Sequence, residues 1–176
     1  MQNRLVISAI APNRPGIANE ITALVTQCDC NILETKMKSM GNTFCLVLMA
    51  SGDWNSLAKL EQVLPTRAHP MGMTTMLKRI ECDDKEKRGL PYRVKFFSSD
   101  NPGIANEITS FFAEREVNIE QMSCDTFLAQ QTKTPIAEIK LTVSVPTKVN
   151  LSSLRNDLDN FCNLQNLDAR FQPITQ

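Results

Sequence analysis

The sequence has few of the residues from which metal, phosphate and nucleic-acid sites are built. It contains one histidine, His69, which excludes a metal site made of several histidines. It has no glycine-rich phosphate-binding loop and no helix-turn-helix pattern. Its 19 basic residues balance its 19 acidic residues, so no overall field attracts a phosphate backbone or an anionic membrane. We therefore predict no metal site and no direct binding of nucleic acid.

Long apolar runs and paired cysteines are missing as well. No run approaches the roughly 20 apolar residues that are needed to span a bilayer. The six cysteines show neither CxxC spacing nor the density of a secreted disulfide framework. A short apolar run at residues 5–11 is better explained as a strand than as a signal peptide, because a matching run at 92–97 lies mid-chain. These features predict a cytoplasmic protein without membrane contact.

An internal repeat divides the chain. Residues 15–22, with the sequence PGIANEIT, recur letter for letter as residues 102–109, at an offset of 87 positions. Asn31-Ile32 and Asn118-Ile119 match at the same offset, so no residue is gained or lost between the two motifs. The 42% of apolar residues suffices for two packed cores. We predict two domains, residues 1–80 and 90–176, joined by a charged linker at 81–89.

The hydrophobic period changes in the same order within each repeat. In the first, it predicts a strand at 5–9, a helix at 17–28, strands at 31–40 and 43–51, a helix from 54 that Pro65 ends, and a last strand at 73–80. Gly41-Asn42 is typical of a tight hairpin between the two middle strands. The second repeat shows strands at 92–96, 139–145 and 167–171, and helices at 104–112 and 151–161. The predicted fold is α+β, with two ferredoxin-like βαββαβ domains in tandem.

The second repeat has about ten more residues in its central hairpin, because the offset grows from 87 to 97 between Leu57 and Leu154. The extra residues, at about 128–135, are rich in glutamine and threonine. Two interpretations stay open: a solvated loop or a contact with a partner.

The repeated Pro-Gly stands where a strand ends and a helix begins. Pro15 and Pro102 suit the first helical position, and the glycine after each lets another group approach the backbone. The free N–H groups and the dipole of the helix attract a carboxylate. Asn13 and Asp100, two residues before the prolines, can hold an ammonium group beside it. The pattern thus outlines an amino-acid site, although the same residues could simply cap a helix and close local turns.

An asparagine opens the second strand of each repeat, where the chain returns beside the first helix. Asparagine is a poor strand former, so its presence there twice suggests a second polar contact. The candidate ligand-binding residues are Asn13, Arg14, Pro15, Gly16, Ile17 and Asn31 in the first repeat, and Asp100, Asn101, Pro102, Gly103, Ile104 and Asn118 in the second.

The order of strand, Asn/Asp-x-Pro-Gly-Ile, helix and Val/Cys-Asn-Ile resembles the ACT domain, a regulatory fold that binds amino acids at interfaces between paired copies. The resemblance covers residues 3–80 and 90–175, and the free-standing tandem members that it resembles most are transcriptional regulators. It implies glycine as the ligand, a DNA-binding regulator protein as the partner and pairing into a homo-oligomer, with no cofactor. Some members place a histidine two residues before the motif asparagine; here those positions are Ala11 and Ser98.

The sequence gives little support for catalysis. Glu20 and Glu107 recur one turn into their helices, where interaction with the helix dipole explains them better than paired acid and base groups. We therefore expect a sensor and no enzyme. Two alternatives stay open: a repressor that binds nucleic acid directly, and a regulatory subunit of an enzyme of amino-acid metabolism.

Overall fold

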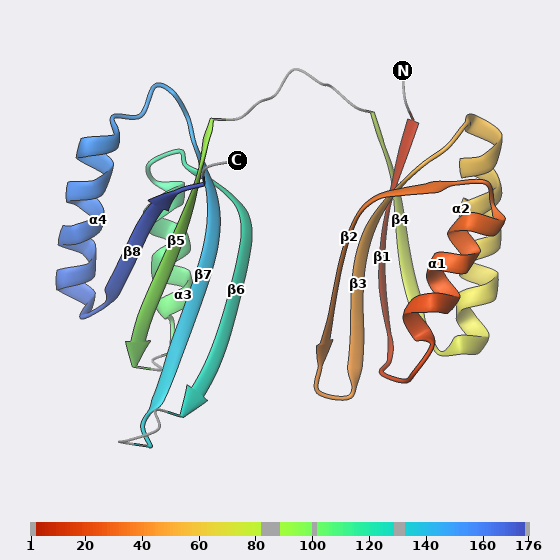
Figure 1. Cartoon of the computed structure of the whole chain (residues 1–176), viewed down its shortest axis with the longest axis horizontal. Coiled ribbons are helices and arrows are strands. Elements are labelled where there is room, and N and C mark those ends of the chain that lie inside the picture. The colour runs from red at the N-terminus through yellow and green to blue at the C-terminus, as the bar shows by residue number, and fades with distance from the viewer. Residues whose placement is uncertain (1–2, 82–88, 100–101, 129–132, 175–176) are drawn as a thin grey trace. The chain divides into compact units, whose positions relative to one another are not determined.

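The computed structural model describes residues 3–81, 89–99, 102–128 and 133–174 (Figure 1). The chain divides into two compact units, Met1–Lys85 and Glu86–Gln176. Most of the linker predicted at 81–89 lies outside the described residues. Within the ranges given above, no helix is both long and apolar enough to cross a membrane.

The two units repeat one order of elements. The first contains β1 (Asn3–Pro12), α1 (Ile17–Gln27), β2 (Asn31–Met40), β3 (Thr43–Ser51), α2 (Trp54–Ala68), the 3-10 turn η1 (His69–Met71) and β4 (Thr74–Glu81). The second contains β5 (Leu90–Ser99), α3 (Ile104–Ala113), β6 (Asn118–Leu128), β7 (Pro135–Val145), α4 (Leu151–Gln165) and β8 (Asp168–Pro173). The predicted βαββαβ order is confirmed in both units.

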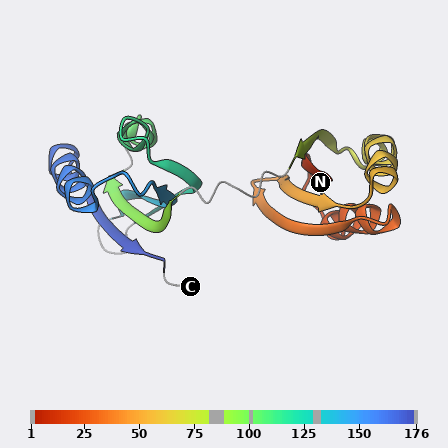
Figure 2. The same cartoon turned by 90° about the horizontal axis from the view of Figure 1, so that it is seen from above.

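Each unit is a four-stranded antiparallel sheet with two helices packed on one face (Figures 1 and 2). The strand orders are β2-β3-β1-β4 and β6-β7-β5-β8. Alternate residues of β1, such as Leu5 and Ile7, are fully buried under the helices, as the period of two predicts. In the second unit the corresponding core is aromatic, with Phe96 and Phe112 in an edge-to-face contact at 6.5 Å between ring centroids. The sandwich predicted from the sequence is therefore present twice.

The hairpin between β2 and β3 has the predicted bounds. Gly41 adopts a φ of 58°, a left-handed conformation that glycine enters without steric cost. The pairing register of the middle strands shifts at the same place in both units, between Ile32 and Glu34 and between Ile119 and Gln121. This shared irregularity shows that the equivalence of the two units extends to their backbone details.

The prediction that Pro65 ends the second helix is wrong. Helix α2 continues through Pro65 to Ala68, and the Pro65 carbonyl accepts a hydrogen bond from the amide of His69. Proline removes one backbone hydrogen bond, but Leu64 and Ala68 on the inner side of this last turn are fully buried. Packing of these residues thus outweighs the local preference of proline.

The prediction that Pro15 and Pro102 take the first helical position is wrong, because α1 and α3 begin at Ile17 and Ile104, where the hydrophobic period predicts them. Gly16 and Gly103 occupy the cap positions, with φ of 88° and 95°, so Pro15 and Pro102 lie in the turn before each helix. The glycine turns the chain sharply enough to direct the following isoleucine into the core, where Ile17 is 3% exposed.

Candidate functional site

The turn before α1 is tied to the neighbouring hairpin. The Asn13 amide donates a hydrogen bond of 2.9 Å to the carbonyl of Asn42, and the Ile17 amide donates one of 3.3 Å to the carbonyl of Arg14. No side chain caps the start of α1, so the first-turn amides are not occupied by a side-chain acceptor. The turn therefore offers the positive end of a helix beside the exposed Asn13.

Arg14 is already engaged within this turn. Its guanidinium donates hydrogen bonds of 2.6 and 2.7 Å to the two carboxylate oxygens of Glu20. This contact lowers the pKa of Glu20 and raises the pKa of Arg14, and the hydrogen bond between the side chains is the main cause of both shifts. Arg14 thus acts as a partner of Glu20 in this structure, and a ligand carboxylate would have to compete for it.

The turn before α3 contains Gly103 in a left-handed conformation. A methyl group placed on Gly103 would meet no atom of the described residues within 4 Å, and none of these residues caps the helix with its side chain. Pro102 is exposed and Ile104 is buried, as in the first unit. The candidates Asp100 and Asn101 lie outside the described residues.

Within each unit, the glycine turn and the asparagine that opens the second strand lie far apart. Asn31 pairs with Ser51, whereas Met40 at the other end of β2 pairs with Thr43 beside the hairpin that binds Asn13. Nine residues of strand, at about 3.3 Å each, put roughly 30 Å between these two ends. Asn13 and Asn31 of one unit therefore do not share a binding site.

Asn118 is placed in the same way, far from Gly103. It lines a surface hollow of about 460 Å³ together with Thr109 and Ala113 of α3. Its side-chain amide donates a hydrogen bond of 2.7 Å to Glu120. Helix α3 spans ten residues, or about 15 Å, and separates Asn118, which follows the end of the helix, from the glycine turn at its start.

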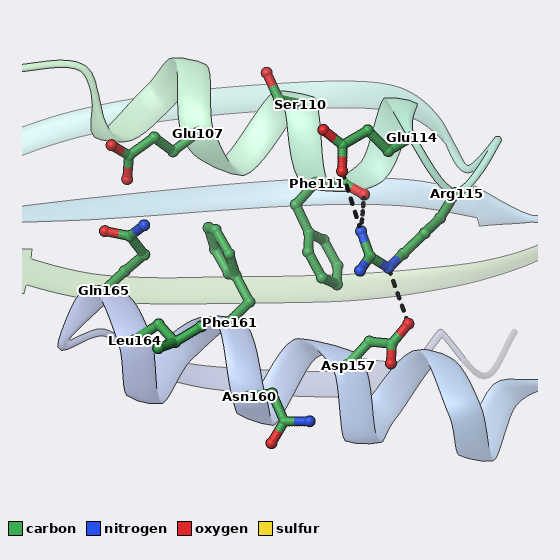
Figure 3. A pocket seen from close by; sticks show the side chains of 10 residues that line it. All are labelled: Glu107, Ser110, Phe111, Glu114, Arg115, Asp157, Asn160, Phe161, Leu164 and Gln165. Carbon is green, nitrogen blue, oxygen red and sulfur yellow. Dashed lines mark hydrogen bonds and ion pairs between the residues drawn. The ribbon is translucent and has the colours of Figure 1, made fainter.

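The sequence did not reveal a groove between α3 and α4, which Figure 3 shows. Phe111 and Phe161 face each other in it, while Arg115 reaches towards Asp157. The periodicity identified the two phenylalanines only as core positions. A signal exists in the repeat: at the offset of 97, Asp157 matches Leu60, so a charged residue replaces a core leucine.

Metal ligands do not gather in the part of the chain that the structure describes. No group of three or more histidine, cysteine, aspartate or glutamate side chains there could hold a metal ion. The features of the described residues that could bind a ligand are the N-termini of α1 and α3, the exposed asparagine side chains and the aromatic groove between α3 and α4.

The first unit matches a known domain family, and the whole chain is similar to known proteins. The family model of the ACT domain matches residues 3–78. The glycine cleavage system transcriptional repressor of Escherichia coli (strain K12) is 26% identical over 161 residues, which cover 92% of this chain and 85% of the relative. The repressor of the same name from Shigella flexneri matches equally well.

Two solved structures match along the whole chain. A crystal structure assigned to a glycine cleavage system transcriptional repressor has a TM-score of 0.76 at 28% identity, covering 100% of this chain and 99% of its own. A protein of unknown function from Galdieria sulphuraria has a TM-score of 0.80 at 17% identity, over 99% and 100% of the two chains, and supports the fold alone. Residues 3–78 therefore match the ACT-domain family, the second unit repeats their fold, and the chain as a whole is similar to the glycine cleavage system transcriptional repressor.

Proposed function

We propose that this protein is a cytoplasmic, glycine-responsive transcriptional regulator that acts through contact with a DNA-binding regulator protein. The observation that supports the proposal most is the similarity to the Escherichia coli repressor over 92% of the chain, with the ACT fold in both units. The zero formal net charge favours a protein partner over direct contact with DNA, because binding to the phosphate backbone depends on cationic surface.

The proposed ligand contacts use the geometry of the two glycine turns. The amides at the start of α1 and α3 would receive the carboxylate of the amino acid, since no side chain of the described residues caps either helix start. Asn13 and Asp100 would hold its ammonium group. Glycine has no side chain, so a site made of backbone amides and short polar groups meets all of its functional groups.

The proposed site is completed by pairing of units. Because about 30 Å of strand separates the Asn13 end of β2 from Asn31, the two asparagines can share a ligand only when they come from different units. We propose that a second copy of the chain supplies the other asparagine, which makes a homo-oligomer the ligand-binding form.

The test is titration calorimetry of the full chain against each of the twenty amino acids. We expect heat of binding with glycine, weakened in Asn13→Ala and weakened more in Asp100→Ala. The carboxylate of Asp100 makes a charge-assisted hydrogen bond with an ammonium group, about twice as strong as the neutral bond of an asparagine. Asn156→Ala on the exposed side of α4 is the matched control, because it removes an exposed asparagine outside both turns.

Two results would contradict the proposal. If both turn variants bind glycine as tightly as the parent, the motifs serve only to cap the helices. Retardation of promoter DNA by the purified protein, at near-physiological salt and without a partner, would favour the direct nucleic-acid-binding repressor instead.

A further inference from the structure

The groove between α3 and α4 combines an aromatic floor with one exposed leucine on an otherwise polar rim. It encloses about 420 Å³. The rings of Phe111 and Phe161 lie 4.9 Å apart at their centroids and form its floor. Leu164 on its rim is 81% exposed, although a leucine gains free energy by leaving water. This surface therefore has the apolar character of a contact site (Figure 3).

A polar pair holds the two helices at this groove. The Arg115 guanidinium lies 4.0 Å from the Phe111 ring centroid, and its Nε donates a hydrogen bond of 3.1 Å to Asp157. The matched residues of the first unit are Cys28 and Leu60, and both are buried in its apolar core. The second unit thus has an ion pair between its helices at the positions where the first unit has two buried apolar side chains.

The rim of the groove carries an excess of negative charge. Three carboxylates, of Glu107, Glu114 and Asp157, line it with one guanidinium, that of Arg115. In the first unit Arg14 binds Glu20, but the residue that matches Arg14 is Asn101, and among the described residues no cation pairs with Glu107. Figure 3 shows the Glu107 side chain at the end of the groove farthest from Asp157. The carboxylate of Glu107 is therefore available to a partner.

We propose that this groove binds an amphipathic helix of a partner protein that presents lysine or arginine beside leucine-like side chains. An amphipathic helix places apolar anchors at positions i, i+3, i+4 and i+7, which suits a groove that runs between two helices. Its apolar side chains would pack on Phe161 and Leu164, and its cations would face Glu107 and Glu114. That this partner is the DNA-binding regulator rests on the proposed function, whereas the chemistry of the groove does not.

The test uses the full chain and a designed helical peptide of about 18 residues, five turns, made of leucine and lysine at amphipathic spacing. We expect shifts of backbone amide resonances along α3 and α4, and affinity about tenfold weaker in Leu164→Lys. Glu107→Gln, which keeps the size of the side chain, should weaken binding about threefold. Met76→Lys is the matched control, because Met76 is 72% exposed on the first unit.

Three outcomes would overturn the assignment: shifts confined to the first unit, equal affinity of Leu164→Lys and the parent, or equal binding of a peptide with glutamate in place of lysine. The amide spectrum of each variant reports directly on its folding. Neither glycine nor promoter DNA takes part in this experiment, so its failure would leave the proposed function standing. Conversely, a chain that binds no amino acid could still bind the peptide.

Discussion

Arg14 holds Glu20 by two parallel hydrogen bonds across the turn that precedes α1. We predict that Arg14→Gln raises the pKa of Glu20 towards its ordinary value of 4.5, because the hydrogen bond from Arg14 is the main cause of the lowered pKa. The folded pKa lies below the unfolded one, so the pair stabilises the fold above the unfolded pKa and loses this effect as the pH falls through the folded pKa. NMR titration of the glutamate carboxyl carbons measures the change; an unaltered Glu20 curve in the variant would contradict the role of the pair.

Helices α2 and α4 are capped at matched positions by residues that differ in charge. Asp53 accepts a hydrogen bond of 2.7 Å from the Ser56 amide, and Asn150 accepts bonds of 2.9 and 3.1 Å from Ser152 and Ser153. The bond from Ser56 lowers the pKa of Asp53, so its capping contribution is present above the unfolded pKa and is lost as the pH falls through the folded one.

We therefore predict that acid weakens α2 before α4, and that Asp53→Asn removes this difference because asparagine does not titrate. Amide hydrogen exchange at pH values between about 2 and 6 would follow the two helices separately. Asn150→Ala should destabilise the second unit by about 1 kcal/mol at any pH in that range. Equal acid sensitivity of α2 in the parent and in Asp53→Asn would contradict the assignment.

The left-handed glycines before α1 and α3 should not tolerate a side chain without cost. We predict that Gly103→Ala lowers the stability of the second unit by about 1–2 kcal/mol, because its φ of 95° strains any residue with a Cβ. Crowding is not the cause among the described residues, since none of them has an atom within 4 Å of the added methyl group. Gly16→Ala should behave alike in the first unit. Urea unfolding followed by NMR measures the free energy of unfolding of each unit. Unchanged values in both variants would contradict the claim that the positive φ makes a side chain costly.

Cys162 should make the second unit sensitive to alkali. Burial, with a smaller effect of Asp159, raises the pKa of its thiol from the ordinary value of 9.0 to about 11. The folded pKa is the higher one, so the stabilisation is complete below the unfolded pKa and is lost as the pH rises from about 9 towards about 11.

We predict that Cys162→Ala flattens the stability curve of the second unit over that range. In the folded parent, iodoacetamide at about pH 8 should label the exposed Cys124 well before Cys162, because the thiolate is the reactive form. Mass spectrometry of timed digests measures both rates. Labelling of Cys162 as fast as Cys124 would show that its thiol is not protected.

The order of elements was predictable from the sequence because each element carries its own period. Leu57, Leu60 and Leu64 mark the buried side of α2, and the turn at Gly41 marks the hairpin. The end of α2 was not predictable in this way. A local rule stops the helix at Pro65, whereas the burial of Ala68 depends on neighbours that only the folded unit supplies.

The site was less predictable, because contacts between distant residues decide it. The motif predicted the positions of the glycine turns. It did not predict that Arg14 donates hydrogen bonds to Glu20, because this contact requires a particular path of the turn. Arg115 and Asp157 are 42 positions apart, and no periodicity relates them. The pair can be found in the sequence only by aligning the two repeats, which shows Asp157 at the position of the core residue Leu60.

The placement of Asn13 and Asn31 at opposite ends of a unit makes each unit half of a receptor under the proposed function. A ligand that bridges two halves stabilises their association by mass action, and association in turn raises the affinity for the ligand. When the second half comes from another molecule, dilution of the protein alone lowers its affinity for the amino acid. Such a sensor responds to its own abundance as well as to its ligand, so a cell could shift the threshold of the response by changing the expression of this chain.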